Sequence, residues 1–174
     1  MQLTRATEHD YPEIVALANL AYRAAGVGAS WTEEADLIEG ARLTEPQLRD
    51  DLAATPHAYL LLYRDSPDGR LRGTVWLEPQ EDGVWYLGLF TVHPELQNRQ
   101  LGRTLLSSAE DFVRENGGKV IRMTVLNVRD VLIAWYERRG YNKTGGSVAF
   151  PYGDDRFGKP LRDDLEFVEI TKEL

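Results

Sequence analysis

The sequence predicts one mixed α/β domain over residues 1–174, with a central mixed, largely antiparallel sheet flanked by helices. Three observations support this fold class. The length of 174 residues suits a single hydrophobic core. In the middle of the chain, segments rich in aromatic and branched residues flank two turn motifs, as strands of a meander do. The rest of the chain alternates strand and helix patterns, which is typical of a crossover between parallel strands.

The N-terminal part of the chain predicts a short strand and three helices. Residues 2–7 have a strand pattern. Residues 8–25 predict a helix, because apolar residues recur there at helical spacing. These residues are Ile14, Leu17, Ala18 and Ala21. Capping-box patterns begin at Ser30 and at Thr44, and each predicts the start of a further helix.

The remaining elements follow from turn motifs and apolar periodicity. The turns "DSPDG" and "PQEDG" divide residues 57–92 into three strands of an antiparallel meander. An apolar stripe then predicts a helix that "ENGG" ends. A strand over residues 119–126 and a helix over 129–139, closed by Gly140, come next. Two final strands, over residues 140–150 and 163–174, complete the fold. Residues 145–163 form a long excursion, and such loops tend to be functional or mobile.

Composition narrows the classes of function. The formal net charge of −8 argues against general binding of nucleic acid or anionic membranes, because both need a basic face. No cysteine is present, which excludes disulfides and a thiol nucleophile and fits a cytoplasmic protein. The three histidines lie far apart without the spacing of metal ligands, so we expect no metal site. We also expect neither a signal peptide nor a membrane span, since no long apolar run exists.

The start of the helix after residue 100 has the features of an anion site. A helix start presents free backbone N–H groups and the positive end of the helix dipole, and phosphate suits both. Here Gln100, Gly102 and Arg103 occupy that start. A nucleotide P-loop is excluded, because no lysine follows Gly102. A dinucleotide fingerprint is excluded, because it needs three spaced glycines and this segment has only Gly102.

On these residues the chain resembles the GNAT superfamily of N-acetyltransferases. The matching positions of its cofactor motif are Val92, Pro94, Gln97, Leu101, Gly102, Leu105 and Leu106. The motif's first glycine is replaced by Gln100. A second segment, residues 125–141, matches at Tyr136, Gly140 and Tyr141. The asparagine of that segment is either Asn127, if the loop is two residues longer here, or is replaced by Arg129.

The resemblance implies acetyl-CoA as acyl donor, a metal-free reaction and direct attack by the amine. Backbone amides of residues 98–103 would hold the pyrophosphate, and Phe90 and Val92 would flank the pantetheine arm. Tyr136 would act as the acid that protonates the leaving thiolate. In many family members a carboxylate on the fourth strand acts as the base. The corresponding strand of this chain, "VWYLGLFTV", has no carboxylate, so no residue is assigned as base. The cofactor-binding residues that we expect are Phe90, Thr91, Val92, Gln97, Asn98, Arg99, Gln100, Leu101, Gly102, Arg103, Thr104, Asn127 and Arg129.

The resemblance also places the acceptor amine against residues 31–42 and the excursion. We expect Trp31, Glu34 and Tyr152 to contact it, and aromatic residues beside carboxylates suit a cationic or amphipathic amine, small or peptidic. A homodimer is compatible with this family. The alternative is a non-catalytic acyl-CoA-sensing module, which Gln100 and the missing carboxylate would support. A phosphate-ester hydrolase is a third reading, against which the absence of a triad motif and of metal ligands counts.

Overall fold

A seven-stranded sheet forms the centre of the protein, and the computed structural model describes residues 1–23 and 34–174, with backbone only for 97–99. The strand order is β1-β3-β4-β5-β6-β9-β7, and β2 pairs separately with β8. The strands are β1 Thr4–Arg5, β2 Ile38–Glu39, β3 Tyr59–Arg64, β4 Leu71–Pro79, β5 Val84–Val92, β6 Val120–Leu126, β7 Asn142–Ala149, β8 Lys159–Pro160 and β9 Glu166–Glu173. The α-helices are α1 Tyr11–Arg23, α2 Glu45–Ala54, α3 Leu101–Glu115 and α4 Asp130–Glu137.

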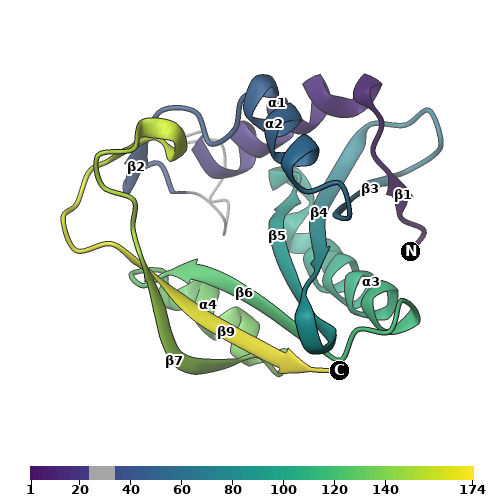
Figure 1. The fold of residues 1–174 in the computed structure, drawn as a ribbon. Helices are drawn as coiled ribbons and strands as arrows, with labels where there is room; N and C mark the ends of the chain where they lie inside the picture. The colour runs from purple at the N-terminus through teal and green to yellow at the C-terminus, as the bar shows by residue number, and fades with distance from the viewer. Residues whose placement is uncertain (24–33) are drawn as a thin grey trace.

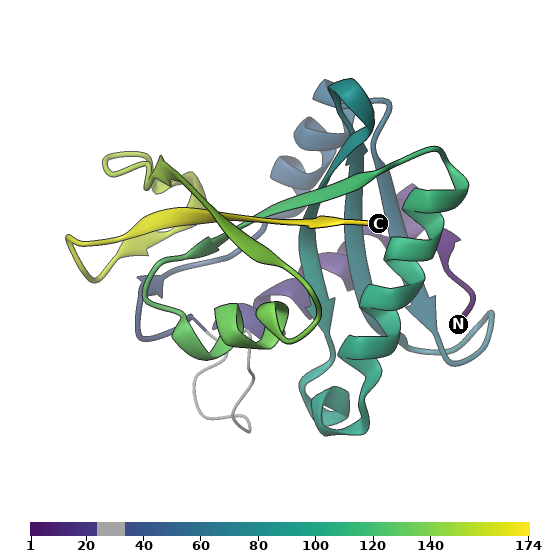
Figure 2. The ribbon, with the colours of Figure 1, turned by 90° about the horizontal axis from the view of Figure 1, so that it is seen from below.

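The helices cover both faces of this sheet (Figures 1 and 2). One apolar core joins α3 and α4 to the sheet, and a second joins α1 and α2 to its other face. The expected stripe of α1 is confirmed, since Ile14, Leu17, Ala18 and Ala21 are all buried. The mixed α/β prediction with a largely antiparallel sheet is therefore confirmed, with β5–β6 the one parallel pair among the described strands.

The parallel pair β5–β6 is short. Cα partners run only from Val84 with Val120 to Tyr86 with Arg122. Beyond that point β6 continues to pair with β9 as far as Leu126, while β5 continues to pair with β4. The sheet therefore divides between β5 and β6, as the teal and green strands in Figure 1 show.

Two of the expected helix starts have different outcomes. Thr44 caps α2 as predicted, with its hydroxyl accepting from the Gln47 amide and the Gln47 side chain accepting from the Thr44 amide. The helix predicted from Ser30 is wrong over residues 34–40, which form a turn and β2 instead; Ser30 and Glu33 lie outside the described residues. The pairing of β2 with β8 gives these residues backbone partners that the sequence pattern does not reveal.

The excursion before β9 is ordered by that same pairing. Gly158 has a φ of 95°, and a Cβ there would lie 2.6 Å from the Glu39 carbonyl oxygen. Only glycine permits this close approach of two backbones. Phe150, within the excursion, and Leu165, just after it, are buried with Ile38 in a third small core.

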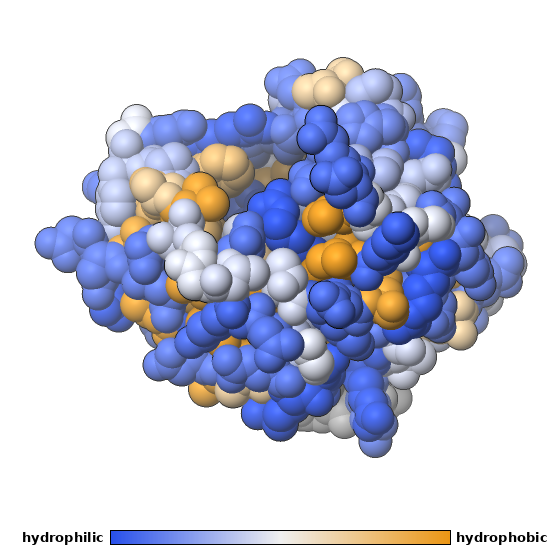
Figure 3. Space-filling model, turned by 60° about the horizontal axis from the view of Figure 1, so that its bottom comes forward, coloured by the Kyte–Doolittle hydropathy of each residue, from blue (hydrophilic) through white to orange (hydrophobic). Residues whose placement is uncertain are grey.

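The surface is mixed in character. On the face drawn in Figure 3, hydrophobic surface appears as separate patches within a largely hydrophilic one, and the surface is hollowed beside one patch. No helix among the described residues is long and apolar enough to cross a membrane.

Candidate active site

A cavity of about 250 Å³ lies where β5 and β6 part. Successive residues of both strands line it, beginning with the last paired residue of β5 and with the residue after the last paired one of β6. Polar side chains reach the cavity from α1, from the segment before α2 and from α4. The C-terminal part of the chain contributes aromatic rings. The residues of these two strands are Tyr86, Leu87, Gly88, Leu89 and Phe90 of β5 and Met123, Thr124, Val125 and Leu126 of β6.

A β-bulge shapes the β5 side of this cavity. Leu89 has a φ of 42°, and the register between β4 and β5 shifts between Thr74 and Trp76. The hydroxyls of Thr74 and Thr91 donate to the Leu89 carbonyl at 2.9 and 3.3 Å, which holds this unusual conformation. Bulges of this kind disrupt ladder pairing and redirect the backbone locally, so β5 turns away from β6 here.

Tyr136 lies in the wall of the cavity and comes from α4. It is buried, and its ring packs against Trp135, Tyr141 and Phe90 at centroid distances of 5.0, 5.6 and 6.5 Å. Within the described parts of the chain, no group accepts a hydrogen bond from its hydroxyl. Burial raises the pKa of Tyr136 well above its ordinary value, so the phenol stays protonated at neutral pH.

The predicted anion site lies at the start of α3. Gln100 precedes the helix in the left-handed region, with φ 59° and ψ 9°. The first turn of α3 contains Leu101, Gly102 and Arg103, whose amides belong to the helix start that lacks intrahelical acceptors. The Thr104 amide and hydroxyl both donate to the Gln100 carbonyl, at 3.0 and 3.3 Å.

A basic groove of about 490 Å³ lies between α3 and the end of α4. Arg103, Arg138, Arg139 and Lys172 line it, and Lys172 is paired with Glu110 at 2.8 Å. Burial lowers the pKa of Arg139, and repulsion from Arg138 and Arg103 adds to this effect. The buried Arg139 Nε has no hydrogen-bond partner among the described residues. The three arginines therefore form an excess of positive charge that suits an anion.

This groove extends the predicted site with two residues that the motif comparison did not include, Arg138 and Arg139. The adjacent arginines before Gly140 are the sequence signal that could have identified them. The Arg139 guanidinium lies over the Trp135 ring at 3.6 Å, and its Nη1 donates to the Trp135 carbonyl at 2.6 Å.

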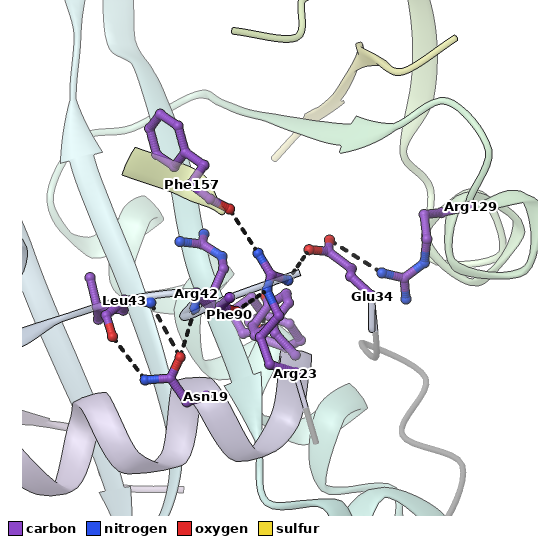
Figure 4. Close-up of polar contacts among 10 residues, drawn as sticks. Asn19, Arg23, Glu34, Arg42, Leu43, Phe90, Arg129 and Phe157 are labelled. Atoms are coloured by element: carbon purple, nitrogen blue, oxygen red, sulfur yellow. Dashed lines mark hydrogen bonds and ion pairs between the residues drawn. The ribbon is translucent and has the colours of Figure 1, made fainter. Parts of the chain in front are cut away.

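Glu34 lies between two arginines at another wall of the cavity (Figure 4). Its carboxylate accepts from Arg23 Nη1 at 2.7 Å and from Arg129 Nη1 at 3.3 Å. All three side chains are at most 13% exposed. Arg23 also donates to the carbonyls of Gly40 and Phe157, so it joins α1 to the two segments that the sequence predicts to contact the acceptor. Glu34 therefore serves as the counter-ion of two guanidinium groups.

The two candidates for the second-motif position have different surroundings. Asn127 connects the end of β6 to the start of β9: its Nδ2 donates to the Asp164 carbonyl, and its Oδ1 accepts from the Glu166 amide. Arg129 is the residue that precedes α4, and it faces Glu34. The Asn127 side chain is thus engaged away from the cavity.

The other predicted residues divide into three groups. Phe90 lines the cavity, and Thr91 and Val92 continue β5 as fully buried residues. The Tyr152 hydroxyl donates to the Arg162 carbonyl and accepts from the Leu165 amide, outside the cavity wall. Trp31 lies outside the described residues, as do the side chains of Gln97, Asn98 and Arg99.

Comparison with known families agrees with this geometry. The model described as the acetyltransferase (GNAT) family matches residues 15–141. No curated protein matches the chain. A ribosomal-protein-alanine N-acetyltransferase from Brucella melitensis has a TM-score of 0.68 at 19% identity, with 100% of both chains covered.

Two further solved structures have the same fold. An IAA acetyltransferase from Bacillus cereus has a TM-score of 0.67 at 15% identity, over 99% of each chain. A chimeric spermidine N-acetyltransferase, built in part from the Vibrio cholerae protein, has a TM-score of 0.68 at 15% identity, over 99% of this chain and 96% of the other.

Proposed function

Since this chain belongs to the acetyltransferase (GNAT) family, we propose that it transfers the acetyl group of acetyl-CoA to the amine of a small molecule or peptide by direct attack. The observation that carries this proposal is the division of the sheet between β5 and β6. This division creates a cavity lined by a buried tyrosine that is protonated at neutral pH. When bound, acetyl-CoA would supply the activated acyl group.

The described residues fit the donor molecule. Amides in the first turn of α3 would bind the pyrophosphate, as the positive end of the helix dipole favours. Arg103 and Arg138 in the basic groove would bind a further phosphate of the nucleotide, because an arginine fork matches phosphate oxygens. The buried Arg139 Nε without a partner supports this fit.

Tyr136 would supply the proton that the leaving thiolate needs. Its phenolic oxygen retains the proton at neutral pH because burial raises its pKa. A thiol has an ordinary pKa of about 8.5, below that of the phenol, so the step requires that the cavity also desolvates the leaving thiolate and thereby raises its proton affinity. The backbone at the Leu89 bulge would direct amide dipoles toward the developing negative charge, as preorganised donors do.

The acceptor remains to be assigned within the class of amines. The names of the structural neighbours refer to an alanine of a ribosomal protein, to IAA and to spermidine, which differ widely in charge. The fold therefore does not select among them. Cytoplasmic location and a homodimer stay predictions from the sequence.

A thiol-release assay with a panel of amines tests this proposal. We expect release of CoA that depends on both acetyl-CoA and an amine. We also expect acetyl-CoA alone to stabilise the protein, by about 2.7 kcal/mol at 100 times its dissociation constant. Stabilisation without release by any amine would indicate a sensing module. No stabilisation and no release would contradict both functions.

A further inference from the structure

The predicted acceptor side of the cavity contains a guanidinium that no carboxylate of residues 1–23 or 34–174 neutralises. Arg42 lines the cavity and also an adjoining pocket that extends toward α2. Its guanidinium lies over the Tyr22 ring at 5.2 Å and has no hydrogen bond or ion pair among the described residues. In Figure 4 it extends from the chain toward Phe157, with no interaction drawn to its end.

The backbone of Arg42 is held firmly in place. The Arg42 amide donates to Asn19 Oδ1 at 2.6 Å, and Asn19 Nδ2 donates in turn to the Leu43 carbonyl at 2.8 Å. Tyr22, beneath the guanidinium, donates its hydroxyl to the Phe90 carbonyl at 2.8 Å. The backbone of Arg42 and the Tyr22 ring under its guanidinium are therefore both held close to the β5 bulge, where the reaction would take place.

The carboxylates of the cleft are engaged elsewhere. Glu34 is shared by Arg23 and Arg129, and Asp51 of the adjoining pocket is paired with Arg156. Glu78, in the same pocket, accepts from the Trp76 indole at 3.4 Å and lies 3.8 Å from His57. Of the charged residues described at the cavity wall, Arg23 and Arg42 are cationic and Glu34 alone is anionic, and Glu34 is also paired with Arg129.

The electrostatics agree with this charge count. Burial lowers the pKa of Arg23, and the nearby Arg42 adds to that effect by repulsion, against the attraction of Glu34. A bound anion beside Arg42 would relieve this repulsion. A cationic amine, which the acidic residues of the sequence suggest, would increase it.

We propose that Arg42 binds a carboxylate of the acceptor, so that the substrate is an amino acid with a free carboxyl group. This inference rests on the proposed function and names its substrate class. A guanidinium fork binds a carboxylate with two parallel hydrogen bonds, which would also orient the amine. A single uncompensated cation matches the single charge of a carboxylate. The aromatic wall of Phe150, Phe157 and Phe167 suits an apolar side chain on that amino acid.

The test compares amino acids with their carboxamides, which keep the amine and side chain but lack the anion. Thiol release is measured for each of the twenty amino acids and its amide, with wild type, Arg42→Gln, Arg42→Lys and Arg70→Gln. Arg70 is an exposed arginine in the turn between β3 and β4, so its variant controls for net charge. Isothermal titration of the N-acetylated acids and amides, with CoA present, gives a readout independent of turnover.

We expect kcat/KM for at least one acid to exceed that of its amide by about tenfold or more. Arg42→Gln should lower the value for the acid by about 10- to 100-fold, as expected for a lost hydrogen bond to a charged group. The amide, acetyl-CoA affinity and Tm should stay unchanged. Arg42→Lys should recover part of the loss, and Arg70→Gln should behave as wild type.

Four results would overturn the inference. If amides or polyamines react as well as acids, the inference is wrong but the proposed acetyl transfer stands. The same holds if Arg42→Gln affects acids and amides alike. If no amine reacts but acetyl-CoA binds, the titration decides: loss of binding of an N-acetylated acid in Arg42→Gln supports the site, and equal or absent binding contradicts it. If acetyl-CoA does not bind, the proposed function fails and the inference fails with it.

Discussion

Gln100 illustrates how a single residue can depart from a motif and still keep its geometry. The family motif has a glycine at this position, and the structure gives Gln100 a φ of 59°, which glycine adopts freely and other residues do not. The backbone conformation therefore explains why glycine suits the position. It also indicates that the glutamine is held there with some strain.

Replacing Gln100 by glycine should consequently stabilise the protein. The left-handed conformation costs roughly 1–2 kcal/mol for a residue with a Cβ, and the greater freedom of unfolded glycine offsets about 0.5–1 kcal/mol of that. We expect a net gain of about 0.5–1 kcal/mol, measured by urea denaturation. The control is Gln100→Ala, which keeps the Cβ and should give no gain. Equal effects of the two variants would show that the side chain, not φ, matters.

Tyr136 is the residue on which turnover should depend most. Tyr136→Phe removes one hydroxyl and keeps the ring that packs against Trp135 and Tyr141. We expect kcat to fall by about 100-fold or more, the usual contribution of a positioned acid. The dissociation constant of CoA, measured by titration, should change little. Turnover equal to wild type would remove this residue from the reaction.

The open choice between Asn127 and Arg129 shows what one sequence cannot provide. Each position can be aligned with the motif by changing the length of one loop. The structure shows what the Asn127 side chain does instead: it binds the backbone near Glu166, 39 residues further along the chain. No local pattern predicts a contact with a segment so distant.

At the scale of elements, local signals predicted most of the secondary structure. The capping box of α2, the apolar stripe of α1 and the turns of the meander all gave the observed elements. The error over residues 34–40 has the opposite cause. A helix-like pattern there is overridden by pairing of β2 with β8, which lies far along the chain.

The groove between α3 and α4 supports a prediction about nucleotide recognition. If Arg103 and Arg138 bind the 3′-phosphate, wild type should bind CoA more tightly than 3′-dephospho-CoA. Arg138→Gln and Arg103→Gln should each reduce that preference by about tenfold, which corresponds to about 1.4 kcal/mol. Titration of both ligands measures it. Arg49→Gln, on α2, is the matched control, and an unchanged preference in all variants would place the phosphate elsewhere.

At the scale of the whole molecule, the sequence predicted a mixed, largely antiparallel sheet with locally parallel pairing. It did not predict that the parallel pair stops after three residue pairs, or that a cavity forms there. That division depends on the Leu89 bulge, which two threonine hydroxyls hold. Strand propensity and alternation do not encode such a local departure from pairing.

Stability of the whole molecule should depend on pH through Arg64. Arg64 bridges Asp10 and Glu13 at 2.8 and 2.7 Å and donates to the Gly69 carbonyl, so it ties the start of α1 to the β3–β4 turn. Burial opposes ionisation of both carboxyls. Hydrogen bonds from Arg64 and from backbone amides outweigh it, so the pKa values of Asp10 and Glu13 are lowered.

Because these pKa values are lower in the folded state, the stabilisation is present above about pH 4.5 and is lost as the pH falls through them. Arg64→Gln should lower Tm near pH 7 by about 2–4 °C, for a loss of about 1 kcal/mol. That difference from wild type should shrink as the pH falls from about 5 to about 2 in calorimetry. If the difference in Tm between Arg64→Gln and wild type does not depend on pH, the variant loses packing and not charge interactions. Arg70→Gln is the control for the change in net charge.

The pairing of β2 with β8 has a consequence for how related proteins diverge. It joins Ile38–Glu39 to Lys159–Pro160, and the Gly158 backbone approaches Glu39 too closely for any side chain. An insertion in either segment would break this contact unless the other segment changed with it. Residues 34–43 and 150–165 should therefore coevolve. Exchanging both segments together between homologues should transfer the preference for an amine more completely than exchanging either segment alone.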